Sequence, residues 1–169
     1  GSEIYLEFGS AAASYNRTTT PATVAADGLV QVAVQGLTPN TRYYYRIRYR
    51  SAAGGTYLAD AERSFHTWRP SGETFTFAVQ ADPHMDVNSS AAVYGQTLAN
   101  ELADGPDFML DLGDTSMVEK CAIDGTTLCA TGMPPSADAV WARNALMRSY
   151  FDLACHSVPL LLVLGNHDG

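Results

Sequence analysis

In the first 68 residues, apolar and polar positions alternate with the period of two that predicts β-strands. The alternation runs through residues 3–9, 29–35 and 42–50, and residues 57–68 supply a further strand. Turn-forming residues in GLTPNT (36–41) and AAGG (52–55) separate these segments. Strands joined by short turns predict an antiparallel β-sandwich. Because a complete sandwich of about seven strands needs about 100 residues, this one is expected to be incomplete.

The hydrophobic pattern changes after the turn-rich RPSGE (69–73), which we interpret as a linker between a domain at 1–68 and another at 74–169. Apolar strands are expected in residues 74–82, 107–114 and 159–168. Amphipathic helices are expected between them, in residues 89–105 and 136–154. Alternating strands and helices predict a parallel α/β sheet. Its strands, LLLVL above all, are apolar enough for burial on both faces.

Composition and charge narrow the possible functions. The chain has 169 residues, of which 46% are hydrophobic and 17% charged, as is typical of a globular protein. Its formal net charge of −8 disfavours nucleic-acid binding through a basic face. No apolar run reaches the roughly 18–20 residues that a membrane span needs. The arginines of residues 42–50 are interpreted as a solvated outer strand face and not as a phosphate-binding row.

The cysteines bear on the compartment in which the protein works. Cys121 and Cys129 lie in a segment rich in turn formers, where they either form a local disulfide or remain free thiols. A disulfide requires an oxidising compartment, so we expect the protein to be secreted, periplasmic or on the cell surface. Cys155 lies in an apolar segment and is expected to be a buried thiol.

Each strand of the second domain is followed by polar residues that can bind a metal ion. Because the carboxyl ends of parallel strands lie along one edge of a sheet, these residues are expected to converge. Carboxylate, imidazole and amide ligands without a thiolate favour Fe, Mn, Zn or Co. Asp111 remains open: it either supports the ligands or is a polar residue at a strand end. The converging residues are Asp82 and His84, then Asp114, then Asn166, His167 and Asp168.

The ordered motifs Asp-x-His (82–84), Gly-Asp (113–114) and Gly-Asn-His-Asp (165–168) resemble those of the metallophosphoesterase, or calcineurin-like phosphoesterase, superfamily. GLTPNTRYYYRIRYR (36–50) resembles the tyrosine-bearing strand of fibronectin type III domains. Together the two resemblances point to the purple acid phosphatase-like branch, which carries such a domain at its N-terminus. They reach only through the N-terminal half of the catalytic domain, so the chain is expected to be truncated at both ends.

The resemblance implies hydrolysis of phosphate esters, monoesters in preference to diesters, with a metal-bound hydroxide as nucleophile. It also implies a site that holds two divalent or trivalent metal ions. The implied ligands are Asp82 and His84 on the first metal, Asp114 between both metals, and Asn166 on the second. His167 is implied to stabilise the transferring phosphoryl group or to protonate the leaving oxygen, with Asp168 holding its ring.

The chain departs from this resemblance in two places. Purple acid phosphatases bind iron through a tyrosinate at the position of Met117, so we expect no tyrosinate–iron absorption band. The later His and Gly-His-x-His motifs that complete both metal shells are absent up to Gly169, and neither His66 nor His156 has a suitable context to replace them. The fragment alone is therefore expected to be inactive. The alternative hypothesis is an inactive secreted or surface binding module that retains the fold.

Overall fold

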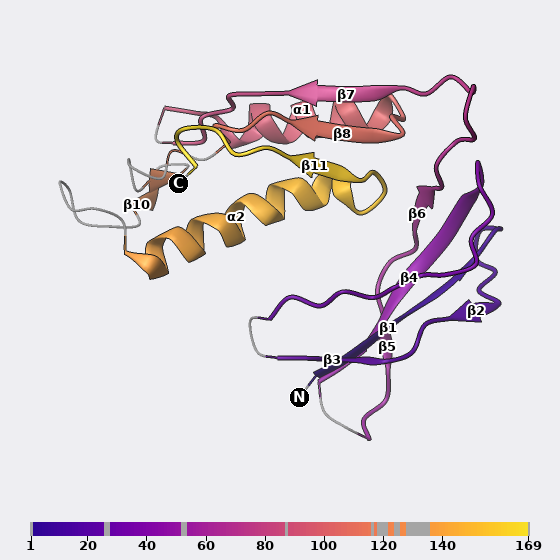
Figure 1. The fold of residues 1–169 in the computed structure, drawn as a ribbon. Helices are drawn as coiled ribbons and strands as arrows, with labels where there is room; N and C mark the ends of the chain where they lie inside the picture. Colours follow the sequence, from indigo (N-terminus) through magenta and orange to yellow (C-terminus); the bar gives the residue numbers. More distant parts are fainter. Residues whose placement is uncertain are drawn as a thin grey trace. The chain divides into compact units, whose positions relative to one another are not determined.

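A computed structural model describes residues 2–25, 28–51, 54–86, 88–115, 117, 122–123, 126–127 and 136–168. The chain divides into two compact units, Gly1–Thr74 and Phe75–Gly169 (Figure 1). Strand pairing in the first unit is antiparallel, whereas the second combines a parallel sheet with two helices. The structure therefore confirms the predicted order of an antiparallel β unit followed by an α/β unit.

The strands of the first unit form one six-stranded antiparallel sheet. Its long central pair, β1 (Ser2–Gly9) and β4 (Arg42–Arg50), runs in register from Glu3 opposite Arg50 to Gly9 opposite Tyr44. β2 (Arg17–Thr18) and β3 (Ala22–Val24) pair with β1, whereas β5 (Leu58–Ala59) and β6 (Arg63–His66) pair with β4. A second sheet facing this one, as in a complete sandwich, is not formed by the described residues.

The strand predicted in residues 29–35 is wrong, because this segment pairs with no strand in the described part of the unit. Its side chains still alternate: the valines at 30, 32 and 34 are half-buried, and the residues between them are exposed. Alternation shows which side chains face inward, but a strand also needs a neighbour for its backbone hydrogen bonds. The carbonyls of Gln35 and Gly36 instead accept hydrogen bonds from the Arg17 guanidinium.

Tyr43 anchors the aromatic core of the first unit. Its ring is buried, stacks on Phe65 with ring centroids 5.7 Å apart, and meets Phe8 edge-on. Its hydroxyl accepts a hydrogen bond from the Thr38 backbone N–H at 3.0 Å, and this bond lowers the pKa of the Tyr43 hydroxyl. This hydrogen bond ties the start of β4 to the segment that precedes the strand.

Three arginines of β4 are paired with carboxylates across the sheet. Glu7 binds both Arg46 and Arg48, and Glu3 binds Arg50. The guanidinium side chains are between 21% and 32% exposed, so this face is partly buried rather than fully solvated. Because each of these positive charges has a carboxylate partner, the row is not an open binding surface for phosphate.

The second unit is built on three parallel strands with β8 at the centre: β7 (Phe77–Gln80), β8 (Phe108–Asp111) and β11 (Leu160–Leu162). α1 (Ala91–Ala103) connects the first two strands, and α2 (Ala137–Cys155) precedes the third. Ser90 caps α1 because its side chain accepts a hydrogen bond from the Val93 N–H. Two short strands, β9 (Ala122–Ile123) and β10 (Thr126–Thr127), pair antiparallel between β8 and α2.

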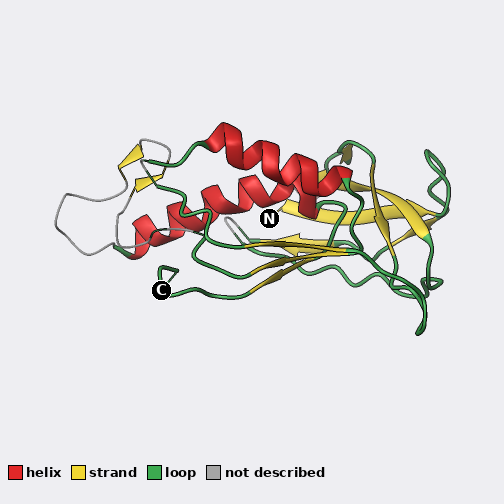
Figure 2. Cartoon of the chain, turned by 90° about the horizontal axis from the view of Figure 1, so that it is seen from above, coloured by secondary structure: helices red, strands yellow, loops and turns green. Residues whose placement is uncertain are grey.

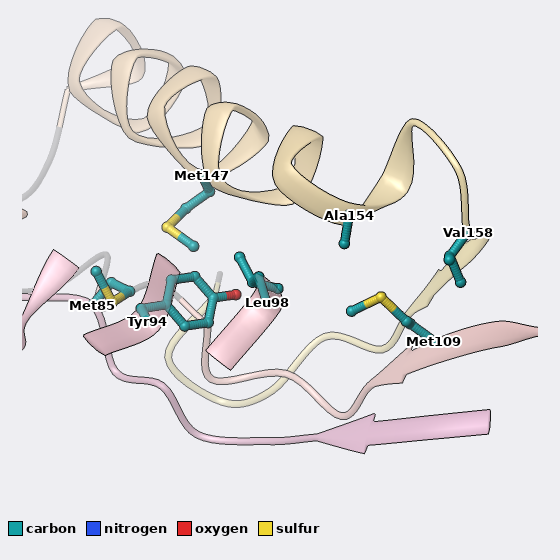
Figure 3. Packing of buried hydrophobic residues seen from close by; sticks show 7 residues of the cluster. All are labelled: Met85, Tyr94, Leu98, Met109, Met147, Ala154 and Val158. Carbon is teal, nitrogen blue, oxygen red and sulfur yellow. The ribbon is translucent and has the colours of Figure 1, made fainter. Parts of the chain in front are cut away.

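Both helices cover the same face of the parallel sheet (Figure 2). The strands follow one another in sequence order across the sheet, so each right-handed crossover places its helix on the same side. The hydrophobic core lies between this face and the helices (Figure 3). Its buried members are Met85, Tyr94, Leu98, Met109, Met147, Ala154 and Val158.

The opposite face of the parallel sheet is not covered within the described residues. Phe77, Val79 and Leu161 lie on it by alternation, and each is about half exposed. The predicted burial on both faces is therefore wrong for this part of the chain. An apolar strand shows a preference for burial, but the direction of the two crossovers decides which face the helices cover. The Phe77 ring stacks instead on Phe108, with ring centroids 5.2 Å apart.

Candidate metal centre

The loops that follow β7 and β8 are joined backbone to backbone. Three amides of the first loop donate to carbonyls of the second: Asp82 to Gly113 at 3.0 Å, His84 to Asp114 at 3.1 Å, and Met85 to Thr115 at 3.1 Å. These bonds extend the contact between the two strands beyond the sheet. The structure therefore brings the predicted ligands of the first two strand ends to one place.

The loop that follows β11 packs against the β8 loop through two glycines. A Cβ atom on Gly113 would collide with the Gly165 backbone, and one on Gly165 would collide with Asp114. The Asp168 carboxylate accepts hydrogen bonds from the N–H groups of Asp114 at 2.8 Å and Gly165 at 2.9 Å. The His167 N–H donates to Asp114 Oδ1 at 2.8 Å. All three strand ends therefore meet around Asp114.

Three potential metal ligands meet at this point. His84, Asp114 and His167 each offer one ligand atom, and these atoms lie within 4.8 Å of one another. His84 Nε2 is 3.6 Å from Asp114 Oδ2, and the centroids of the two imidazole rings are 5.4 Å apart. His84 Nε2 is buried and forms no hydrogen bond in the described part of the chain. A buried imidazole nitrogen that makes no hydrogen bond, within 4 Å of two carboxylates, fits a cation that binds the imidazole and a carboxylate together.

The backbone at these residues is held in a conformation that side chains disfavour. Asp82, His84 and Asp114 have φ angles of 55°, 44° and 51°, and the described chain has only two other non-glycine residues with positive φ, Ala13 and Asn40. Each such residue costs free energy and persists only where its surroundings hold it in place, which is common at functional sites. The strain therefore coincides with the predicted ligands.

The remaining residues that the sequence predicted for the site lie at different distances from the cluster of His84, Asp114 and His167. Asp82 Oδ1 lies 3.3 Å from His84 Nε2, but the Asp82 side chain is 63% exposed and lies outside the three-residue cluster. Asn166 is exposed in the turn after β11, and its role as a ligand stays a prediction. His167, predicted to act on substrate, lies among the ligand atoms as well. The hold of Asp168 on the His167 ring stays a prediction.

The sequence left the role of Asp111 open and did not point to Arg143, and both are buried charged residues. Asp111 is fully buried at the end of β8, and Arg143 is 1% exposed in α2. The Arg143 guanidinium donates a hydrogen bond to the Met117 carbonyl in the loop that carries Asp114. In the sequence, each could be noticed only as a charged residue at a position expected to face the core. Such a residue needs a hydrogen-bond or ion-pair partner once it is buried, but the sequence does not show which residue that partner is.

Of the three cysteines, Cys155 lies within the described residues. Cys121 and Cys129 lie outside the described residues, so their disulfide and the secreted, periplasmic or surface location that depends on it stay predictions. Cys155 is a partly buried free thiol at the end of α2, and burial raises its pKa to about 11. The thiol is therefore protonated at neutral pH and is a poor nucleophile or metal ligand.

Neither described helix combines the length and apolar character needed to cross a membrane. Comparison with protein-family models and with curated proteins finds no match for this chain. The observations that bear on function are the chemistry of the three strand ends and the distances between their ligand atoms.

Proposed function

We propose that the second unit is the N-terminal half of a metallophosphoesterase-type domain, which hydrolyses phosphate esters with two metal ions. The observation that carries this proposal is the buried His84 Nε2, which has no hydrogen bond and lies beside Asp114 and His167. Imidazole and carboxylate ligands from three strand ends suit Fe, Mn, Zn or Co. Asp82 and Asn166, on the same loops, would complete the ligand set, and Asp114 would serve as a ligand to both ions.

The residues around Asp114 have distinct proposed roles. When bound, the metal ions supply a water molecule of lowered pKa as the nucleophile and neutralise charge on the phosphate. Asp114 Oδ1 accepts the His167 N–H, which leaves Oδ2 on the side of His84. The His167 side chain is proposed to contact the phosphoryl oxygens or to protonate the leaving oxygen. In so acidic a chain, the cations provide the local positive charge for an anionic substrate.

We further propose that the first unit is a partial fibronectin type III-like domain, as in the purple acid phosphatase-like branch. The buried Tyr43 supports this proposal, because its hydroxyl accepts a hydrogen bond from the Thr38 N–H five residues upstream. The same turn-and-tyrosine arrangement occurs in sandwich domains of this kind. The proposal for the first unit stands independently of the catalytic one.

The catalytic proposal is tested on the complete protein by metal analysis and by turnover of p-nitrophenyl phosphate and bis(p-nitrophenyl) phosphate. We expect about two transition-metal ions per chain and faster turnover of the monoester. Asp114→Asn keeps the shape of the side chain but removes its charge from the centre of the ligand set. We expect this variant to lose bound metal and at least about a hundredfold in turnover.

The matched control is Asp104→Asn, which changes an exposed carboxylate at the end of α1. This variant is expected to retain metal and activity. Full metal content and turnover in Asp114→Asn would overturn the proposed role of Asp114. A folded protein that binds no metal and cleaves neither ester would indicate instead the inactive binding module.

A further inference from the structure

Asp111 ends the central strand of the second unit. The strand register pairs it with Gln80 of β7 on one side and with Leu162 of β11 on the other. Its backbone carbonyl accepts a hydrogen bond from the Val163 N–H at 2.8 Å. Asp111 is therefore the last residue of β8 at which all three strands are paired, directly before the loops that carry the proposed ligands.

The Asp111 side chain is fully buried, and both of its oxygens accept hydrogen bonds. Oδ1 accepts from the Gly113 N–H at 2.9 Å and from the Thr115 hydroxyl at 3.0 Å. These two donors lie on either side of Asp114 in the sequence. Oδ2 accepts from the Gln80 side-chain amide at 2.6 Å. One carboxylate thus fixes both ends of the short segment that carries Asp114.

The same contacts reach the loop that carries His84. Thr115 is buried, and while its hydroxyl binds Asp111, its backbone carbonyl accepts the Met85 N–H at 3.1 Å. Met85 directly follows His84, whose own N–H donates to the Asp114 carbonyl. A displacement of Thr115 would therefore move two proposed ligands, one on each loop.

We propose that Asp111 is a positioning residue for the metal site, which holds Asp114 and His84 in their ligand geometry without binding metal itself. This inference rests on the proposed function. Asp114 has a φ angle of 51°, and the hydrogen bonds that Asp111 accepts on either side of it help to offset the free-energy cost of that conformation. An apolar residue at position 111 would leave the buried Gly113 N–H without an acceptor.

The inference is tested by titrating the complete metal-free protein with Mn²⁺ and following the ion by electron paramagnetic resonance. Asp111→Ala is expected to weaken Mn²⁺ binding by about 10–100-fold, the usual effect of removing a residue that orients metal ligands. Asp111→Asn is expected to stay close to wild type, because its oxygen still accepts from Gly113 and Thr115. Its amide can then pair with the Gln80 Oε1, which has no hydrogen bond in the described chain.

Leu98→Ala serves as the stability control, since Leu98 is fully buried in the core and belongs to none of the three loops. It is expected to lower the melting temperature while preserving Mn²⁺ affinity well below that temperature. An equal loss of affinity in Leu98→Ala and Asp111→Ala would show that Asp111 acts only through general stability. That result would overturn the inference, and so would wild-type affinity in Asp111→Ala.

Thr115→Val and Thr115→Ser decide the question if Asp111→Ala does not fold. The valine removes the hydroxyl at nearly constant shape, whereas the serine keeps it. Weaker Mn²⁺ binding in Thr115→Val and near wild-type binding in Thr115→Ser are expected, and equal affinities would overturn the inference. If the folded wild-type protein binds no Mn²⁺, Zn²⁺, Co²⁺ or Fe²⁺, the proposed function fails, and the inference fails with it.

Discussion

At the scale of single residues, the surroundings of Glu101 disfavour the ionised form of its carboxyl group. Burial, together with the charges of Asp111 and Asp104, raises the pKa of the Glu101 carboxyl above its usual value of 4.5. One of its oxygens is buried without a hydrogen bond in the described chain, and the residue lies near the C-terminal end of α1, where negative charge is disfavoured.

Glu101→Gln is therefore expected to stabilise the protein at neutral and alkaline pH. A carboxyl whose pKa is raised by folding binds its proton more tightly in the folded state, so its ionisation destabilises the fold as pH rises above 4.5. Melting temperatures measured from pH 4 to pH 8 should show a gain that grows with pH and vanishes in acid. Asp104→Asn is the control, because it removes an exposed negative charge from the same end of α1. An equal gain in melting temperature in this variant would show that the charge at the helix end, and not burial, accounts for the effect.

At the scale of elements, the close approach of the β8 and β11 loops makes Gly165 sensitive to substitution. Gly165→Ala places a methyl group against Asp114, so we expect a loss of about 1–3 kcal/mol in the free energy of unfolding and weaker metal binding. Gly95→Ala is the matched control, because a methyl group there meets only Leu153 at 3.6 Å and α1 gains about 0.5–1 kcal/mol. Equal effects of the two substitutions, measured by urea denaturation, would contradict this account.

Hydrophobic patterns predicted most elements because period and length are local properties. β4, both helices and the parallel strands follow from such patterns, whereas residues 29–35 have the alternation of a strand but no neighbour to pair with. The approach of His84, Asp114 and His167 to one another could be predicted because the carboxyl ends of parallel strands lie along one edge of the sheet. The roles of Asp111 and Arg143 depend on contacts between distant segments, which no local pattern specifies.

At the scale of the whole molecule, the two units differ in charge. Residues 1–74 carry seven basic and six acidic side chains, whereas residues 75–169 carry three basic and twelve acidic ones. The ion pairs of β4 account for much of the balance in the first unit. The net negative charge of the protein therefore belongs to the unit with the proposed metal site, where it attracts cations.

A substitution that destabilises the core of the second unit is expected to leave the stability of the first unit unchanged. Leu98→Ala removes a fully buried side chain from the second unit and should lower its free energy of unfolding by about 2–5 kcal/mol. Hydrogen exchange measured by mass spectrometry should accelerate in α1 and α2 and remain unchanged in β1 and β4. Equal acceleration in both units would show that they unfold as one.

The loops after β7, β8 and β11 are held together by hydrogen bonds between residues of the chain, so their arrangement does not depend on a bound ion. The entropy lost in ordering these loops is therefore lost when the chain folds, and little more is lost when an ion arrives. Cation binding should accordingly change the heat capacity only slightly, since it buries little new apolar surface. Its driving force is then expected to come from the water molecules that the ion and the carboxylates release.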